Sequence, residues 1–382
     1  MCMFNIYFDN ASTAPPLDMG ELMKACAVTD GRFPNSLSSV EGRAFGNPSS
    51  PHGLGIQAER AINSARAETA AILGCENSEI IFTSGGTESN NLAIIGFALA
   101  NKRQGIDIFA EPWEHPSVLE PIKFAREMGY ANLHDGARLV CLSHVNHETG
   151  DIQNISEIAS NLKNEKTKTI IFVDGVQAFC KENLNLKNID MYSFSGHKFH
   201  AGHGAGGLFV RKGIRLVPLL HGGGQEFSIR AGTENVNAIT RMAETAKFLH
   251  SLQTKSHAKT SAIKSELAKL TKLLPDCFIN SRDDPSPYIL NLSFLGIKGE
   301  TLVHALSEKG VYVSMGAACS TRKKQKSTLE SMGFSANRAE SAVRFSFSIL
   351  NTREEAVIAK NLVLETVGQL RAMNVENERI LK

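Results

Sequence analysis

Short apolar segments that alternate with helix-like segments constrain the fold of this chain more than any other feature. Residues 79–83, 138–143, 169–173 and 191–195 are short and mostly apolar, which is typical of buried strands. Residues 53–74, which precede the first of them, carry apolar side chains at near-helical spacing. Short strands separated by helices predict a mostly parallel sheet in an α/β domain.

The second half of the chain has a different pattern. A long polar, helix-like stretch covers about 238–274, and two strand-like segments, 288–294 and 311–314, then flank a predicted helix at 300–309. This change predicts a large α/β domain followed by a smaller α+β domain. The expected boundaries are 15–255 for the large domain and 1–14 together with 256–382 for the small domain.

Charge and composition exclude several classes of partner. Lys plus Arg is 41 and Asp plus Glu is 39, so the net charge is only +2 and no basic stripe indicates nucleic acid. The longest apolar run, residues 92–100, is far shorter than the roughly 20 residues that span a bilayer. Residues 1–10 lack the pattern of a signal peptide. We therefore expect a cytoplasmic protein with neither a nucleic-acid nor a membrane partner.

The cysteines also bear on the environment of the protein. Seven are scattered along the chain and no CxxC pair occurs, which argues against a disulfide framework and a structural zinc site. A reducing compartment and no bound metal are the resulting predictions. Cys141 and Cys180 lie in or beside apolar strands and are expected to pack as small hydrophobic residues.

A lysine and an aspartate follow two of the predicted strands. Asp174 ends the strand 169–173, and Lys198 follows the strand 191–195 in a glycine-rich turn. The carboxyl ends of parallel strands face the ligand crevice of such a sheet, so both side chains can converge on one ligand. Partial burial near other cations lowers the pKa of a lysine and makes its neutral amine reactive. Pyridoxal phosphate enzymes need this pair, whereas the alternative is a solvated loop lysine.

Three other interpretations of the same stretch are weaker. Gly202, Gly204 and Gly207 form a GxGxxG pattern, but a strand-like segment follows where a dinucleotide site needs a helix. Residues 195–198 form an SxxK pattern without the companion motifs of a serine acyl-enzyme. The three histidines of this stretch lie in a glycine-rich turn, which does not hold them on one helical face as metal ligands. They are His197, His200 and His203.

A candidate phosphate site lies earlier in the chain. Residues 83–91, TSGGTESNN, follow a predicted strand, and free backbone amides at a helix start with the Thr87 hydroxyl can bind an anion. The alternative is a plain N-cap by Thr87, with Glu88 in the first helical turn. His115 precedes a proline, which favours an extended backbone that suits a side chain lying over a flat ring.

Cys319 differs from the other cysteines in its surroundings. Small residues precede it and a basic stretch, RKKQK at 322–326, follows it. Nearby cations favour the nucleophilic thiolate. The sequence therefore predicts a reactive cysteine on an exposed loop rather than one that packs in the core.

Together these motifs resemble the cysteine desulfurases, which are class V, fold-type I pyridoxal phosphate enzymes. The resemblance covers nearly the whole chain and keeps the family's order. Residue 147 is His where the family more often has Asn, and His203, Gly204 and Ala231 also depart from its pattern. The matching segments are YFDNAST (7–13), FGNPSSPHGLG (45–55), EIIFTSGGTESNNLAI (79–94), EHPSV (114–118), HVNHETG (144–150), VDGVQ (173–177), SFSGHK (193–198), GGGQE (222–226), RAGTENV (230–236), SMGAACS (314–320) and VRFSFS (343–348).

The resemblance implies a fold with a seven-stranded, mostly parallel sheet and a set of site residues. It implies that Lys198 holds the aldehyde of pyridoxal 5'-phosphate and that Asp174 pairs with its ring nitrogen. His115 is implied to stack on the ring and to carry protons, since imidazole titrates near neutrality. The remaining implied contacts are Asn146 and Gln177 at the ring hydroxyl; Gly86, Thr87, Ser195 and His197 at the phosphate; Thr233 at the phosphate of a partner subunit; and Asn10, Asn146 and Arg344 at the substrate.

The implied reaction converts L-cysteine to L-alanine and leaves the sulfur on Cys319 as a persulfide. The resemblance further implies a homodimer and a sulfur-acceptor scaffold protein in iron–sulfur cluster assembly. A selenocysteine lyase and a class V aminotransferase of a small amino acid remain open alternatives. A scaffold that has lost activity is disfavoured, because Lys198, Asp174, Arg344 and Cys319 are all present.

Overall fold

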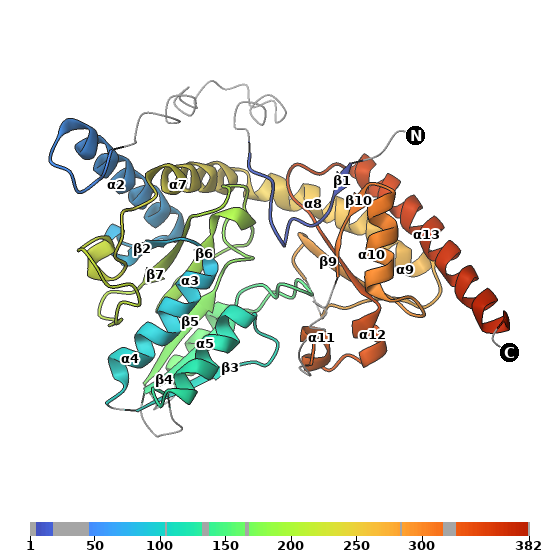
Figure 1. Cartoon of the computed structure of the whole chain (residues 1–382), viewed down its shortest axis with the longest axis horizontal. Coiled ribbons are helices and arrows are strands. Elements are labelled where there is room, and N and C mark those ends of the chain that lie inside the picture. The colour runs from blue at the N-terminus through green and yellow to red at the C-terminus, as the bar shows by residue number, and fades with distance from the viewer. Residues whose placement is uncertain are drawn as a thin grey trace.

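The computed structural model describes residues 5–17, 46–103, 105–131, 137–164, 168–282, 285–315 and 326–380. Its larger part is built around one mixed sheet with helices on both faces (Figure 1). The strands are β2 (Ile80–Thr83), β3 (Ile106–Ala110), β4 (Ala137–Ser143), β5 (Thr169–Asp174), β6 (Met191–Ser195) and β7 (Gly206–Val210). The helices are α2 (Gly53–Leu73), α3 (Gly86–Asn91), α4 (Phe97–Asn101), α5 (Pro116–Glu127), α6 (Ile155–Lys163) and α7 (Val236–Ser251).

The strand order of this sheet is β2-β7-β6-β5-β4-β3. Strands β3 to β6 run parallel, and β7 runs antiparallel to both of its neighbours. The described residues thus form six strands where seven were expected.

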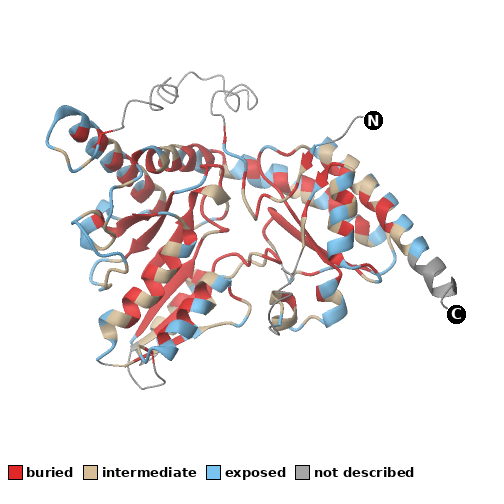
Figure 2. Cartoon of the chain, in the orientation of Figure 1, coloured by how far each residue is buried: buried red, intermediate tan, exposed pale blue. Residues whose placement is uncertain are grey.

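Alternating side chains of the strands enter two separate hydrophobic cores. Phe82 and Val173 pack with α2, α6 and α7 on one face of the sheet. On the other face, Ile81 and Phe172 pack with the helical turn Leu92–Gly96 and with α4 and α5. Successive residues of a strand point to opposite faces, so a strand that is covered on both sides is apolar throughout. Figure 2 shows this sheet as almost entirely buried. Cys141 and Cys180 belong to these two cores, as predicted.

The smaller part is an antiparallel sheet covered by helices. Its strand order is β11-β12-β9-β8, and a separate parallel pair joins β1 to β10. The strands are β1 (Ile6–Tyr7), β8 (Cys277–Ile279), β9 (Ile289–Phe294), β10 (Val311–Tyr312), β11 (Ser314–Met315) and β12 (Ala342–Ser346). The helices are α8 (Gln253–Ala268), α9 (Leu270–Leu273), α10 (Gly299–Glu308), α11 (Thr328–Ser331), α12 (Ala336–Glu340) and α13 (Arg353–Ile380).

The core of the smaller part draws on both ends of the chain. Ile6 and Phe8 pack with residues between 263 and 367. We propose the division into residues 15–255, and 1–14 with 256–382, because the hydrophobic cores separate close to these boundaries. The helix-like stretch 238–274 is interrupted, since α7, α8 and α9 are separate helices with Leu252 and Lys269 between them.

In the part of the chain that the structure describes, no helix combines the length and apolar character needed to cross a bilayer. The same residues contain no cluster of three or more His, Cys, Asp or Glu side chains arranged to hold a metal ion. The histidines of the glycine-rich turn have other contacts. His200 Nδ1 lies 2.7 Å from the Pro15 carbonyl oxygen, and His203 Nε2 lies 3.2 Å from Thr13 Oγ1.

Candidate active site

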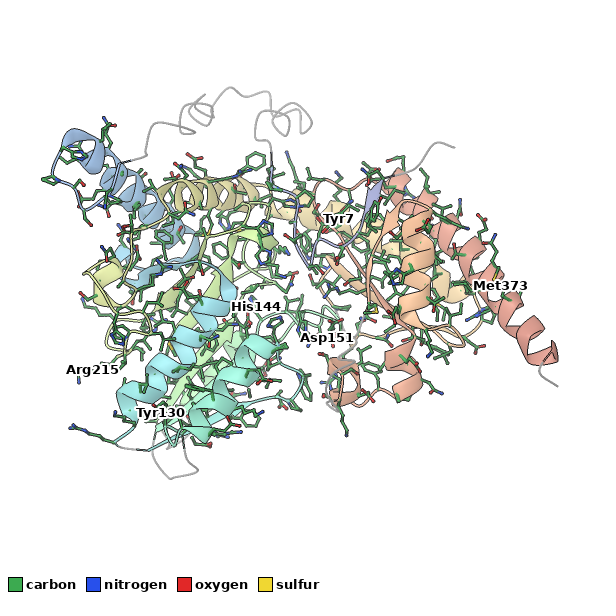
Figure 3. All side chains as sticks on the ribbon, viewed as in Figure 1. Tyr7, Tyr130, His144, Asp151, Arg215 and Met373 are labelled. Carbon is green, nitrogen blue, oxygen red and sulfur yellow. The ribbon has the colours of Figure 1, made fainter. Side chains whose placement is uncertain are left out.

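A cavity of about 790 Å³ lies at the carboxyl ends of the central strands. Its walls come from both parts of the molecule, because β12 and the N-terminal segment close the side opposite to the sheet. Figure 3 shows Tyr7 and Asp151 in this junction, away from Tyr130, Arg215 and Met373. The predicted site residues that line the cavity are Gly86, Thr87, His115, Asp174, Gln177, Ser195, His197, Lys198 and Arg344.

Lys198 ends a single 3-10 turn, Gly196–Lys198, directly after β6. Its Nζ donates to the carbonyl oxygens of Ala11 and Ser12, at 2.7 and 2.9 Å. Burial and, next, the nearby Arg344 guanidinium lower the pKa of Lys198 to about 8. A lysine with this pKa has a substantial neutral fraction near neutral pH, which a nucleophile or general base requires.

Asp174 is the last residue of β5 and is 8% exposed. One carboxylate oxygen accepts from Asn90 Nδ2 at 2.8 Å and the other from the Val176 backbone N–H at 3.0 Å. The turn after β5 is closely packed, because a Cβ at Gly175 would lie 1.9 Å from the Tyr192 ring. Glycine is therefore required there, and the aspartate is held at the end of its strand.

The turn between β2 and α3 has the form expected of an anion site. Gly85 is the N-cap of α3 and supplies no side-chain cap, so the alternative in which Thr87 caps the helix is wrong. Glu88 instead accepts from the Ser84 backbone N–H at 2.8 Å. A Cβ at Gly86 would lie 2.6 Å from the Val176 Cγ2 methyl group, so a larger residue at this position would require Val176 to move. Gly86 and Thr87, at the start of this helix, line the cavity, and the first backbone N–H groups of a helix have no intrahelical partner.

His115 has the extended backbone predicted from the following proline, with φ −62° and ψ 145°. It is the N-cap of α5, and its Nδ1 accepts from the Ser117 backbone N–H at 3.1 Å. Burial lowers its pKa, and the cations Lys198 and Arg344 act in the same direction while Asp174 opposes them. Its ring meets that of His147 edge to face, with centroids 5.0 Å apart.

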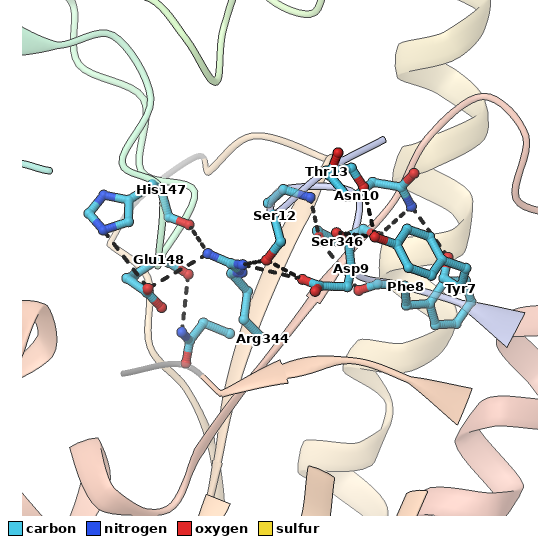
Figure 4. A network of polar contacts seen from close by, with 12 residues as sticks. Tyr7, Phe8, Asp9, Asn10, Ser12, Thr13, His147, Glu148, Arg344 and Ser346 are labelled. Carbon is cyan, nitrogen blue, oxygen red and sulfur yellow. Dashed lines mark hydrogen bonds and ion pairs between the residues drawn. The ribbon is translucent and has the colours of Figure 1, made fainter. Parts of the chain in front are cut away.

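Arg344 lies on β12 and reaches the cavity from the smaller part of the molecule (Figure 4). Its Nη1 donates to the His147 carbonyl oxygen and its Nη2 to Ser12 Oγ, both at 2.7 Å. Two carboxylates flank the guanidinium, since Asp9 Oδ1 lies 3.3 Å from Nη2 and Glu148 Oε1 lies 3.6 Å from Nη1. Its buried Nε has no partner among the described residues, which leaves one donor for a ligand.

Glu148 is nearly buried beside this guanidinium. Burial raises its pKa to about 7, even though Arg344 acts in the opposite direction. Sequence analysis missed Glu148, together with Asp9 and Ser12. Each lies within two residues of one that was singled out, in the motifs HVNHETG and YFDNAST. The motifs therefore pointed to this region, but nothing in the sequence distinguished these three side chains from their neighbours.

Three predicted site residues lie outside the main cavity. Asn10 Nδ2 donates to the Ser346 carbonyl oxygen at 3.0 Å, and Asn10 borders a small adjoining cavity beside Lys198. Asn146 Oδ1 accepts from the backbone N–H groups of residues 148 and 149, and the residue lines a different cavity. Thr233 is exposed and does not line the cavity of its own chain.

Cys319 and the basic residues 322–325 lie outside the described residues. The described residues on either side, Met315 and Lys326, both line the main cavity. The described residues that flank the segment with Cys319 thus belong to the cavity wall, which the sequence analysis did not predict.

Several buried polar atoms at the site have no hydrogen-bond partner among the described residues. Ser195 Oγ and Gln177 Oε1 belong to residues that line the main cavity, and Asn146 Nδ2 belongs to a residue that lines a different cavity. Buried polar groups are seldom left unpaired, so these atoms fit an oxygen-rich ligand. With Lys198, Asp174 and the glycine turn, they fit an aldehyde, a ring nitrogen and a phosphate on one molecule.

Comparison with known proteins assigns a family to this arrangement. The model of the family described as aminotransferase class V matches residues 35–135 and 126–357. A NifS/IcsS protein homolog of Lactobacillus delbrueckii is 37% identical, over 92% of this chain and 94% of that protein. A cysteine desulfurase IscS of Buchnera aphidicola is 34% identical, over 97% and 94%. A putative cysteine desulfurase IscS 1 of Bacillus subtilis is 36% identical, over 96% and 100%.

Solved structures agree with this assignment. A NifS-like protein superimposes with a TM-score of 0.83 at 30% identity, covering 96% of this chain and all of that one. The structure described as SspA in complex with cysteine has a TM-score of 0.73 at 29% identity, covering 90% and 99%. The second comparison links the same fold to bound cysteine in a relative.

Proposed function

This chain belongs to the class V aminotransferase family and, within it, to the cysteine desulfurases; from that premise we propose how its cavity removes sulfur from L-cysteine and leaves L-alanine. One observation carries the proposal. A lysine of lowered pKa and an arginine with a free donor face one cavity, and the chain on both sides of Cys319 borders it.

The proposed cofactor is pyridoxal 5'-phosphate, which the family uses. When bound, it supplies an electron sink for the electrons of the substrate Cα–H bond. Lys198 would hold its aldehyde and Asp174 its ring nitrogen, and His115 would lie over its ring. The other residues proposed to hold it are Gly86, Thr87, Ser195 and His197 at the phosphate, and Asn146 and Gln177 at the ring hydroxyl.

The substrate carboxylate is proposed to bind Arg344. The donors Nη1 and Nη2 are already engaged by the His147 carbonyl oxygen and Ser12, which fixes the plane of the guanidinium. Nε is the donor left for the carboxylate, and Nη2 becomes available as its 3.3 Å contact with Asp9 is exchanged for the substrate. This fork orients the substrate in a way that a lysine at the same position does not reproduce.

Proton transfer is assigned to Lys198 and His115. The neutral amine of Lys198 accepts the proton from the substrate Cα, and its pKa of about 8 suits that role. His115, which also lines the cavity and precedes α5, moves a second proton. Asn10, beside Lys198, holds the N-terminal segment whose carbonyl oxygens accept from Nζ.

Cys319 is the proposed sulfur acceptor. Its thiolate attacks the substrate sulfur, the bond between that sulfur and the substrate Cβ breaks, and an S–S bond forms. The electron pair of the broken bond stays with the carbon fragment, which takes up protons to become alanine, and the persulfide retains the sulfur. A scaffold protein then accepts this sulfur, in iron–sulfur cluster assembly or another sulfur-requiring pathway.

A homodimer is part of the proposal, with Thr233 reaching the phosphate in the partner subunit. Large apolar side chains are exposed at the start of α2 and in the loop that carries Thr233, which supports a second copy packing there. They are Leu54, Ile56, Leu220 and Phe227.

The test is the release of alanine and sulfide from L-cysteine with a thiol reductant, in the wild type and in Cys319→Ala. Equal amounts of the two products, both lost in the variant, are expected. Transamination that survives in Cys319→Ala, with the amino group leaving the substrate and the sulfur retained on it, would favour an aminotransferase. Activity confined to selenocysteine would favour a selenocysteine lyase. The absence of both products from cofactor-loaded wild type contradicts the proposal.

A further inference from the structure

Two side chains without an assigned role connect His115 to Asp174. Asn90 is fully buried on α3, and its Nδ2 lies 2.8 Å from Asp174 Oδ2 and 2.8 Å from Ser117 Oγ. Ser117 Oγ in turn lies 2.8 Å from His115 Nδ1. The two proposed cofactor contacts, on β5 and at the start of α5, are thereby joined by a continuous chain of hydrogen bonds.

The chemistry of these groups determines which atom donates and which accepts in each of these hydrogen bonds. Asp174 already accepts from the Val176 backbone N–H, and as a carboxylate it accepts from Asn90 as well, so the Asn90 amide nitrogen faces it. The second N–H of the same amide is donated to Ser117 Oγ. Because that oxygen accepts from Asn90, its own hydrogen is available for His115 Nδ1. His115 Nδ1 also accepts the Ser117 backbone N–H at 3.1 Å.

We propose that Asn90 and Ser117 are positioning residues that hold His115 in the neutral form protonated on Nε2. With two donors directed at Nδ1, a proton on that atom would displace both. His115 therefore faces the cavity with a hydrogen on Nε2 and acts there as a proton donor. The assignment of this proton to turnover rests on the proposed function, whereas the tautomer itself does not.

The charged groups around His115 agree with a neutral ring. The cations Lys198 and Arg344 oppose a second proton, and only Asp174 among the neighbouring charges favours one. His147, on the loop after β4, presents the edge of a ring whose pKa burial holds well below its usual range. Glu114 precedes His115; its Oε1 accepts from the Ser143 backbone N–H at 3.1 Å, and burial raises the pKa of its carboxyl to about 8.

The experiment is an NMR titration of histidine ¹⁵N resonances in the cofactor-free protein, so its readout does not depend on activity. The variants are Ser117→Ala, Ser117→Thr and Ser156→Ala. Ser156 is the matched control, because it is the second residue of α6 as Ser117 is of α5, and it lies far from the cavity.

In the wild type, His115 is expected as the Nε2–H tautomer. Ser117→Ala removes one donor to Nδ1, so the pKa of His115 is expected to rise by about 0.5–1 unit, the equivalent of one hydrogen bond. Ser117→Thr, which keeps the hydroxyl, restores the wild-type value, and Ser156→Ala leaves it unchanged. In the cofactor-loaded enzyme, the acidic limb of kcat/KM moves to higher pH in Ser117→Ala.

Two results would overturn the proposal. If Ser117 accepts from the imidazolium instead of donating to the neutral ring, Ser117→Ala lowers the pKa of His115 and the proposal is wrong. A wild-type Nδ1–H tautomer overturns it as well. An enzyme that shows the expected tautomer and no desulfurase activity would contradict the proposed function while leaving this inference intact.

Discussion

The two walls of the cavity are built in different ways. The wall around Asp174 and Lys198 comes from strand ends and turns of a single sheet, in which β5 and β6 are neighbours. The wall around Arg344 joins β12 to the N-terminal segment and to the loop after β4, through contacts that span 332 residues to Ser12 and 197 residues to His147. The first wall follows from local sequence, and the second exists only when the two parts of the molecule are packed together.

The two walls also differ in how they manage charge. Asp174 is held by an amide and a backbone N–H, so its environment is formed from neutral donors. Arg344 lies between the carboxylates of Asp9 and Glu148, and the proposed substrate carboxylate would displace part of these contacts. A buried cation needs such partners, because removing one leaves an uncompensated charge. We therefore predict that the wall around Asp174 and Lys198, the proposed cofactor wall, is the more stable one. The wall around Arg344, the proposed substrate wall, is predicted to respond to ligand and pH.

The largest effect is expected at Lys198. Lys198→Ala removes both the proposed covalent anchor and the proposed base, so kcat/KM should fall by about a thousandfold or more. The visible absorbance of the bound cofactor should shift as well. Steady-state assays and absorbance spectra check this, with the exposed Lys187→Ala as the matched control. An active Lys198→Ala enzyme would show that Lys198 is neither the covalent anchor of the cofactor nor the base.

Glu148 is predicted to make the substrate wall sensitive to pH. Its pKa is raised from 4.5 to about 7, so between these values the folded protein binds more protons than the unfolded chain. Ionisation of this carboxyl therefore lowers the free energy of unfolding as the pH rises through this window, by up to about 3 kcal/mol. Glu148→Gln should remove this slope in urea unfolding at pH 5 and pH 7, whereas the exposed Glu59→Gln should keep it. Parallel slopes in Glu148→Gln and wild type would refute the prediction.

Arg344→Lys tests the two-donor fork without removing the positive charge. Loss of a charge-assisted hydrogen bond of about 1.5–3 kcal/mol should lower kcat/KM about ten- to a hundredfold, mainly through KM. The cofactor wall should be unaffected, so the absorbance of the bound cofactor should match the wild type. A changed spectrum with an unchanged KM would place Arg344 at the cofactor instead of the substrate.

The smallest effect is expected for His147→Asn. The contact with Arg344 uses the His147 carbonyl oxygen, which any residue supplies, so kcat/KM should stay within about threefold of the wild type. The edge-to-face contact with His115 is lost, which should lower the free energy of unfolding by about 0.5–1.5 kcal/mol. Urea unfolding and steady-state kinetics measure the two effects separately. A large loss of activity at unchanged stability would indicate a chemical role for the imidazole.

Local patterns predicted the larger sheet and its functional strand ends well. Apolar strand segments located β2, β4, β5 and β6 to within one residue, and the proline after His115 predicted its extended backbone. These features depend on backbone geometry and on neighbours within a few residues. The count of seven strands came from family resemblance, whereas the described residues form six strands in this sheet.

The sequence by itself determined the family, the strand–turn placement of Asp174 and Lys198, and the glycine turn at Gly86, because each depends on short-range order along the chain. Only the tertiary structure decided which groups surround Arg344, that Glu148 titrates near neutrality, and that Asn90 and Ser117 link Asp174 to His115. Those properties arise when side chains distant in sequence are brought within hydrogen-bonding distance and shielded from water. Their strength depends on burial and on partner geometry, neither of which is encoded in any one segment.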